Sequence, residues 1–305
     1  MDKHFLHIHD LSKEEILNIL SLAKDLKSKF HNKEDFKHFH NKSLAMIFAK
    51  PSARTRISFE TGFTWMGGHA LFLGPNDIGI GKREAIKDIA RVVSRYNDII
   101  MARLFDHAHI LELAEYSDSP IVNGLTDYNH PCQIMADIFS IWEAKNRIED
   151  LKICYVGDGN NIVHSWLHFA SKISMNFVCV CPEGYTPEEQ TVELARKGGC
   201  SEIEISHDPH TAVQNADVVY TDVWASMGQK EEVEEREKLF KDFQVNEKLM
   251  ESAGKETLFM HCLPAERGRE VTDEVIESDI SIVFDQAENR LHIQNSIMVT
   301  LAGKG

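Results

Sequence analysis

The sequence predicts an α/β fold with two doubly wound parallel-sheet domains joined by a long helix. Short apolar runs alternate with helical patterns along most of the 305 residues, as is typical of parallel sheets covered by helices. A long helical pattern at 131–146 separates two halves, and 43% hydrophobic content allows each half a core. We therefore expect domains at 1–146 and 147–286, with a C-terminal helix, 287–305, packing back on the first.

The expected elements can be followed in chain order. Ser12 and Glu15 form a capping-box pattern, and apolar residues with helical spacing follow it, so the chain opens with an amphipathic helix. The expected strands are residues 44–48, 99–103, 121–123, 152–156, 177–181, 218–221, 258–261 and 282–284. The last helical pattern extends from Gln286 to Leu301.

The charge balance excludes one large class of partners. Thirty-three Lys and Arg against 48 Asp and Glu give a formal net charge of -15, which repels nucleic acid. A small anionic substrate would need cationic ligands gathered locally. No membrane span or secretory apolar stretch is visible, so we expect a soluble cytoplasmic protein with no membrane partner.

The six cysteines favour neither disulfides nor a metal centre. They form no CxxC pair and no zinc-like spacing with histidine, so no metal or other cofactor is expected. Cys179 and Cys181 lie in an apolar run that is typical of a buried strand.

In open parallel sheets, ligands bind beyond the carboxyl ends of the strands. Polar residues follow seven of the expected strands, at 52–56, 103, 130–133, 157–161, 222–228, 261–264 and 288–290. We expect these segments to converge on one or more ligands.

The segment 50–56 favours a phosphate site. It lies between a strand and a helix, and it combines the hydroxyls of Ser52 and Thr55, helix-start N–H groups and the Arg54 guanidinium. Arg56 and Glu60 stand four residues apart and are expected to form a structural ion pair instead.

Arg103 ends a buried strand, where a guanidinium needs an anionic partner, either a ligand or a buried carboxylate. His130 and Gln133 are three residues apart at the start of the linking helix and so share a face, as ligands or as a capping pair.

The second half offers groups that suit an amino acid. Residues 157–161 resemble a dinucleotide loop, but the third glycine of that motif would fall at Ile162. Asn160 and Asn161 provide donors and acceptors for α-amino and carboxylate groups, and Asp222 provides a carboxylate for an amine. Each is also a common turn or cap residue.

In this order and across nearly the whole chain, these segments resemble the ornithine carbamoyltransferases, whose SxRTR, HPxQ, SMG and HCLP motifs are intact here. The first half resembles aspartate carbamoyltransferase as well. Residues 226–228 and 261–264 favour the ornithine enzyme, because the aspartate enzyme is expected to carry proline at position 262.

The resemblance implies transfer of the carbamoyl group from carbamoyl phosphate to the δ-amine of ornithine, by direct attack, in a homotrimer or a multiple of trimers. It implies that carbamoyl phosphate is bound by Ser52, Ala53, Arg54, Thr55, Arg103, His130, Gln133, Leu263 and Arg290. It implies that ornithine is bound by Asn161, Asp222, Ser226 and Met227. Arg103, His130, Thr55 and Cys262 would act at the reacting atoms, with Cys262 shaping the site rather than attacking.

Two positions depart from the family pattern. Ala53 stands where many relatives have threonine, which removes one hydroxyl. Gly79 stands where a loop from the neighbouring subunit commonly brings glutamine, and Lys82 or Arg83 is a hypothetical substitute.

Two other classes of function stay open at this point. The doubly wound pattern with Gly157 and Gly159 also occurs in nucleotide-dependent oxidoreductases, and the fold also suits an amino-acid-binding protein without catalysis. Within the family, putrescine or an acylated ornithine are alternative acceptors.

Overall fold

The computed structural model describes residues 3–80, 84–225 and 233–303. The chain divides into two compact units, which are described separately below. Unit 1 comprises Met1–Phe139 and Glu288–Gly305, and unit 2 comprises Ser140–Ala287. Among the described residues, no helix is long and apolar enough to cross a membrane.

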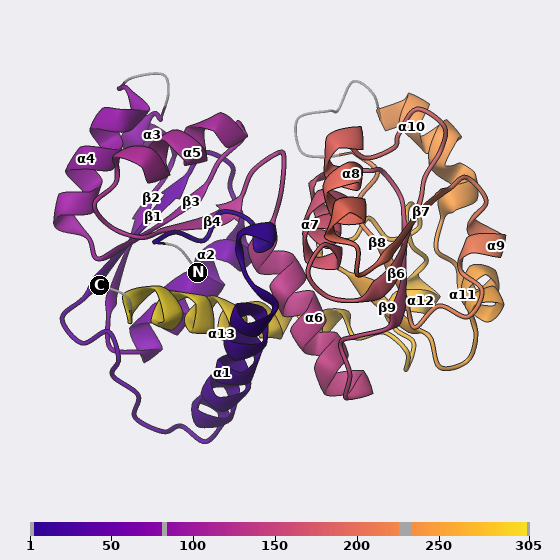
Figure 1. Cartoon of the computed structure of the whole chain (residues 1–305), viewed down its shortest axis with the longest axis horizontal. Helices are drawn as coiled ribbons and strands as arrows, with labels where there is room; N and C mark the ends of the chain where they lie inside the picture. Colours follow the sequence, from indigo (N-terminus) through magenta and orange to yellow (C-terminus); the bar gives the residue numbers. More distant parts are fainter. Residues whose placement is uncertain (1–2, 81–83, 226–232, 304–305) are drawn as a thin grey trace. The chain divides into compact units, whose positions relative to one another are not determined.

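Unit 1 is built on a four-stranded parallel sheet with the order β2-β1-β3-β4 (Figure 1). The strands are β1 (Ser43–Phe48), β2 (His69–Leu73), β3 (Ile99–Arg103) and β4 (Ile121–Leu125). The helices are α1 (Lys13–His31), α2 (Ala53–Trp65), α3 (Pro75–Ile78), α4 (Ile86–Tyr96), α5 (His107–Tyr116), the first part of α6 (Pro131–Lys145) and most of α13 (Val283–Ala302), with a 3-10 turn at Ile8–Asp10.

Unit 2 is built on a five-stranded parallel sheet (Figure 1). Its strand order is β7-β6-β5-β8-β9. The strands are β5 (Leu151–Val156), β6 (Met175–Val180), β7 (Glu202–Ser206), β8 (Val218–Thr221) and β9 (Leu258–His261). The helices are α7 (Asn161–Ala170), α8 (Glu189–Gly198), α9 (Pro209–Ala212), α10 (Val233–Phe240), α11 (Glu247–Ala253) and α12 (Asp273–Ile276), with a 3-10 turn at Lys241–Phe243.

Both sheets are doubly wound, as the sequence predicts. In unit 1 the strand order reverses at the β1–β3 pair, and in unit 2 it reverses at the β5–β8 pair. Such a switch point leaves an open crevice beyond the carboxyl ends of the two strands, where ligands bind in this class of fold. The segments that follow β1, β3, β5 and β8 are therefore the ones the architecture presents to a ligand.

The predicted capping box at the start of α1 is confirmed. Ser12 Oγ accepts a hydrogen bond from the backbone N–H of Glu15 at 3.2 Å, and Glu15 Oε2 accepts one from the N–H of Ser12 at 3.0 Å. The linking helix and the C-terminal helix also form, and α13 packs back on unit 1, where Ser296 Oγ donates to the carbonyl of Ile19 at 2.7 Å.

Three details of the prediction are wrong. Strands β2 and β7 were not expected; both are partly exposed edge strands without the continuous apolar run of a buried strand. Residues 282–284 do not form a strand, because α13 begins at Val283 and the carbonyl of Ile282 accepts from the N–H of Gln286 at 2.9 Å. An apolar run of three residues is too short to show whether its periodicity is that of a strand or of a helix.

The contact between α2 and α13 depends on a glycine. A Cβ on Gly62 would lie 2.1 Å from Oδ1 of Asn295, a side chain that is fully buried. The helix would otherwise gain roughly 1 kcal/mol from alanine. The steric overlap outweighs this gain, because Asn295 is fully buried and cannot move aside. The net effect of alanine on stability is therefore unfavourable.

We therefore predict that Gly62→Ala lowers the free energy of unfolding by about 1–3 kcal/mol, the usual cost of overpacking. Urea unfolding followed by circular dichroism measures it, and Thr61→Ala, on the exposed side of α2, is the control. An unchanged or raised stability of Gly62→Ala would contradict the packing described.

Candidate active site

The start of helix α2 contributes to a cluster of cationic side chains in unit 1. Strand β1 ends at Phe48, and Ser52 caps α2 by accepting a hydrogen bond from the N–H of Thr55 at 3.3 Å. The first-turn N–H groups and the helix dipole favour an anion at this point. Thr55 itself is fully buried.

Two arginines from distant parts of the chain meet at the Thr55 hydroxyl. Arg103 ends strand β3, and its Nη1 lies 3.5 Å from Thr55 Oγ1. Arg290 comes from α13, and its Nη2 donates to the same oxygen at 3.0 Å. Both guanidinium groups are buried. The structure thus brings together three of the predicted phosphate ligands.

His130 joins this group immediately before α6. Its side chain is buried, and the burial, together with the positive charges of Arg290, Arg103 and Lys50, holds the pKa of its imidazole well below the ordinary value of 6.5. The imidazole is therefore neutral at physiological pH and offers one N–H donor. A neutral donor among cations suits an oxygen on which negative charge grows.

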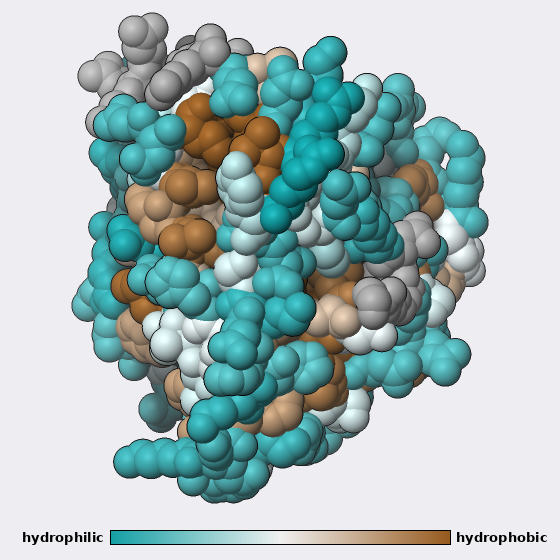
Figure 2. All heavy atoms as spheres, turned by 90° about the vertical axis from the view of Figure 1, so that its left-hand side faces the viewer, coloured by the Kyte–Doolittle hydropathy of each residue, from teal (hydrophilic) through white to brown (hydrophobic). Residues whose placement is uncertain are grey.

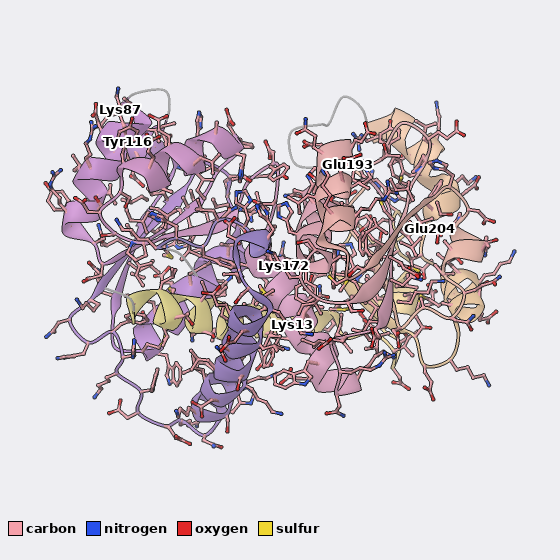
Figure 3. All side chains as sticks on the ribbon, in the orientation of Figure 1. Lys13, Lys87, Tyr116, Lys172, Glu193 and Glu204 are labelled. Carbon is pink, nitrogen blue, oxygen red and sulfur yellow. The ribbon has the colours of Figure 1, made fainter. Side chains whose placement is uncertain are left out.

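Lys50 is a member of this cationic cluster that the sequence did not single out. It is buried except for 8% of its surface, and its Nζ lies 3.6 Å from Asp127 Oδ1. Charged side chains such as Lys87 of α4 and Glu193 of α8 are by contrast exposed at the surface (Figure 3). The cluster therefore concentrates positive charge in a chain of net charge -15.

Other predicted phosphate ligands lie nearby without joining the cluster. Arg54 is half-buried in the first turn of α2, and no hydrogen bond or ion pair links it to another described residue. Gln133 is buried and donates from Nε2 to Asp137 Oδ1 at 2.8 Å. The predicted structural pair is confirmed, since Arg56 Nε lies 3.1 Å from Glu60 Oε2.

Asp222 is the centre of the polar group in unit 2. It follows β8, and its Oδ1 accepts from Cys262 Sγ at 3.0 Å and from the N–H of Val223 at 2.8 Å. Its Oδ2 accepts from Asn160 Nδ2 at 3.0 Å. The contact to Asp222 thus comes from Asn160, which also caps α7, while Asn161 is the first residue of that helix.

His261 fixes the loop that follows β9. Its Nδ1 accepts from the N–H of Leu263 at 2.9 Å, so its proton resides on Nε2 and faces Glu270 Oε1 at 3.1 Å. Both side chains are fully buried. Leu263 has a φ of 56°, and Cys262 lies between these anchors. His261 is therefore a positioning residue for the Cys262 loop.

The glycines of the 157–159 segment serve backbone packing. The N–H of Gly159 donates to the carbonyl of Tyr185 at 2.9 Å, and a Cβ on Gly159 would lie 2.3 Å from the backbone nitrogen of Pro187. The close approach explains Gly159 without a dinucleotide, which removes the main motivation for the oxidoreductase alternative.

Asp158 has a partner that sequence reasoning missed. Arg236 of α10 donates from Nη1 to Asp158 Oδ2 at 2.6 Å and to the carbonyl of Trp224 at 2.8 Å. Arg236 is buried although it lies in a run, 229–241, that is dense in charges of both signs. No local sequence signal distinguishes it from the exposed charges around it.

Several predicted site residues have little or no structural description. Gly79 ends α3 with a left-handed φ of 54°, a conformation that favours glycine. Lys82, Arg83, Ser226 and Met227 lie outside the described residues.

Family models match both halves of the chain. The carbamoyl-P binding domain of aspartate/ornithine carbamoyltransferase matches residues 3–143, and the Asp/Orn binding domain of the same family matches residues 149–301.

Relatives of known name match over nearly the full length. The chain is 60% identical to the chloroplastic ornithine carbamoyltransferase of Pisum sativum, over 99% of this chain and 81% of the relative. It is 48% identical to the anabolic ornithine carbamoyltransferase of Pyrococcus furiosus, over 99% of this chain and 96% of the relative.

Solved structures agree. Ornithine carbamoyltransferase from Pyrococcus furiosus superposes with a TM-score of 0.94 at 48% identity, covering 98% of this chain and 97% of the other. The anabolic enzyme from Campylobacter jejuni gives a TM-score of 0.92 at 38% identity, covering 99% of both chains. This chain therefore belongs to the aspartate/ornithine carbamoyltransferase family.

Proposed function

We propose that this chain is an ornithine carbamoyltransferase, which transfers the carbamoyl group of carbamoyl phosphate to the δ-amine of L-ornithine and releases L-citrulline and phosphate. The observation that carries the assignment is the meeting of Arg103, Arg290 and His130 around Thr55 in unit 1. The relatives named ornithine carbamoyltransferase support the acceptor. Two relatives are named anabolic, which supports a step in arginine biosynthesis.

The residues of unit 1 would act on carbamoyl phosphate. The N–H groups of 52–55 and the Arg54 guanidinium would hold the phosphate, and Arg103, His130 and Thr55 would donate to the carbamoyl oxygen as negative charge grows there. The role of Gln133, Leu263 and Arg290 in binding is part of the same proposal. We assign the carbamoyl phosphate domain to 1–146 with 287–305, and the ornithine domain to 147–286.

The residues of unit 2 would hold ornithine. The Asp222 carboxylate attracts an amine, and it would repel the second carboxylate of aspartate. Asn161, Ser226 and Met227 are proposed to bind the amino-acid end, and Asn160 and Cys262 hold the Asp222 carboxylate. Attack by the neutral δ-nitrogen on the carbamoyl carbon forms the C–N bond, the C–O bond to phosphate breaks, and the amine loses its proton.

A homotrimer is the proposed assembly, and exposed apolar surface on unit 1 supports an interface there. Ile57 is 62% exposed and Leu71 of edge strand β2 is 41% exposed. A surface groove of about 650 Å³ lies along α2, lined by Arg56, Ile57, Glu60, Thr61, Thr64 and Trp65. Figure 2 shows hydrophobic residues gathered in patches on the side of the molecule that lies at the left of Figure 1. Light scattering of the purified protein would give the mass.

The cytoplasm is the proposed location. All six cysteines are free thiols, which fits a reducing compartment. One relative is named chloroplastic, so fractionation of the source cells is the appropriate test.

The function is tested by supplying carbamoyl phosphate with four acceptors side by side: ornithine, N-acetylornithine, putrescine and aspartate. We expect citrulline and phosphate in equal amounts with ornithine alone. Phosphate release that depends on a different acceptor, or on none, would contradict the assignment.

Arg54 and Arg56 form a matched pair for the phosphate site. We predict that Arg54→Ala loses roughly 3 kcal/mol of transition-state stabilisation, about 100-fold in kcat/KM, as when an oxyanion donor is removed. Arg56→Ala loses an exposed ion pair with Glu60, worth less than about 1 kcal/mol of stability, and should keep near-normal kcat/KM. Equal activity of the two variants would remove Arg54 from its role.

The pH dependence should follow the acceptor. An alkylamine has a pKa of about 10.4. Below that value, the reactive neutral form of ornithine becomes about tenfold more abundant for each unit by which the pH rises. Turnover at fixed total ornithine should therefore rise from about pH 7 to about pH 9. A flat profile would show that amine deprotonation does not limit the reaction.

His130 should keep its charge state throughout that range. Because burial and the neighbouring cations hold its pKa well below 6.5, the imidazole stays neutral from about pH 7 to about pH 9 and contributes no step to the pH profile. Nitrogen-15 NMR of the histidine side chains measures this, with His130→Gln to assign the signal. A His130 signal that titrates near pH 6.5 would mean that the imidazole is not buried among cations.

A further inference from the structure

Two histidines and a glutamate from opposite ends of the chain meet in unit 1. His31 is the last residue of α1, whereas Glu288 and His292 lie one turn apart on α13. The Nε2 atom of His31 lies 2.6 Å from Glu288 Oε1, and the Nε2 atom of His292 lies 3.2 Å from the same oxygen. One ligand atom from each residue lies within 4.8 Å of the other two. The proposed reaction uses none of these groups.

We propose that His31, Glu288 and His292 form a binding site for a divalent transition-metal ion of the zinc type. Two imidazole nitrogens and one carboxylate oxygen are a ligand set that holds Zn²⁺ in proteins, with water in the fourth position. The sequence could not indicate this site, because its ligands are separated by most of the chain.

The distances suit such an ion after a small adjustment. Bonds of about 2.0–2.2 Å at tetrahedral angles place neighbouring ligand atoms roughly 3.3 Å apart. The His292–Glu288 distance of 3.2 Å already matches. The His31 pair at 2.6 Å must open, and it can, because the His31 side chain ends its helix and is 53% exposed.

The buried ligand is oriented before any ion arrives. His292 is fully buried, and its ring packs edge-on against Phe30, with 5.4 Å between the ring centroids. Phe30 in turn packs edge-on against Trp65 at 5.3 Å. Burial lowers the pKa of His292 to about 4, so its imidazole is neutral at physiological pH. Without an ion the ring donates from Nε2 to Glu288, so its proton moves to Nδ1 when Nε2 binds the metal.

One neighbouring charge opposes the ion. The positive charge of Lys27 acts on both Glu288 and His292, and its Nζ donates to Asn289 Oδ1 at 2.8 Å. The positive charge of Lys27 repels the ion and therefore lowers the affinity of the site for it.

A bound ion would tie the end of α1 to α13. Arg290 lies between Glu288 and His292 on the same helix, and it donates to Thr55 at 3.0 Å. The ion would thus fix the helix turn that carries Arg290, and it would stabilise unit 1 in proportion to its occupancy.

The test uses Co²⁺ as a spectroscopic substitute for Zn²⁺, titrated into the purified full-length protein. We expect the visible bands of four-coordinate Co²⁺ without thiolate charge transfer, saturating at one ion per chain and displaced by Zn²⁺. His31→Ala and Glu288→Gln should weaken binding by roughly tenfold or more, whereas His40→Ala, an exposed histidine outside the cluster, should not. Lys27→Gln should tighten binding, and Zn²⁺ should raise the Tm of the wild type but not of His31→Ala.

The proposal is overturned if His31→Ala and Glu288→Gln bind Co²⁺ as the wild type does, or if the spectrum shows thiolate ligands. It is also overturned if Lys27→Gln leaves the affinity unchanged, which would place the ion elsewhere. Neither readout depends on carbamoyl transfer, so the metal site and the proposed reaction can fail independently.

Discussion

The hydroxyl of Thr55 is the point on which the account of unit 1 depends. Arg103 and Arg290 both donate to it, and burial, reinforced by these cations and Lys50, holds the pKa of His130 well below its ordinary value. In a chain of net charge -15, such a concentration of buried positive charge is costly unless an anion compensates it. The doubly wound sheet makes it possible, because β1 and β3 end side by side at the switch point and α13 packs back to add Arg290.

The polar group of unit 2 is arranged differently, around the Asp222 carboxylate, which uncharged donors hold in place. Asp222 accepts from Cys262 and Asn160, and both donors belong to segments that follow neighbouring strands of the sheet. The buried pair of His261 and Glu270 fixes the Cys262 loop, because His261 accepts from the N–H of Leu263 and is held in turn by Glu270. The carboxylate attracts an amine and repels a second carboxylate, which gives a physical reason for an ornithine-type acceptor over aspartate.

Sequence reasoning searched for site residues through one general rule, that ligands bind beyond the carboxyl ends of the strands. It singled out Arg103, because a guanidinium at the end of a buried strand needs an anionic partner, whereas Arg290 was assigned through the family resemblance. It missed Lys50 and Arg236, since their burial depends on tertiary packing that the local pattern does not encode. It also missed β2 and β7, whose partly exposed faces lack a continuous apolar run, and it took 282–284 for a strand. The structure shows that Asn160 contacts Asp222, and the role of Asn161 as an ornithine ligand stays a prediction.

The central claim is that two arginines from remote segments hold one anion. A double-mutant cycle on the equilibrium binding of carbamoyl phosphate, with Arg103→Gln, Arg290→Gln and the double variant, tests it most directly. Residues that share one ligand and one hydroxyl should show a coupling energy of about 1 kcal/mol or more. If the losses of binding free energy in the single variants add to that of the double variant within about 0.5 kcal/mol, the two side chains do not share one ligand. Binding unaffected by either change would also contradict the claim.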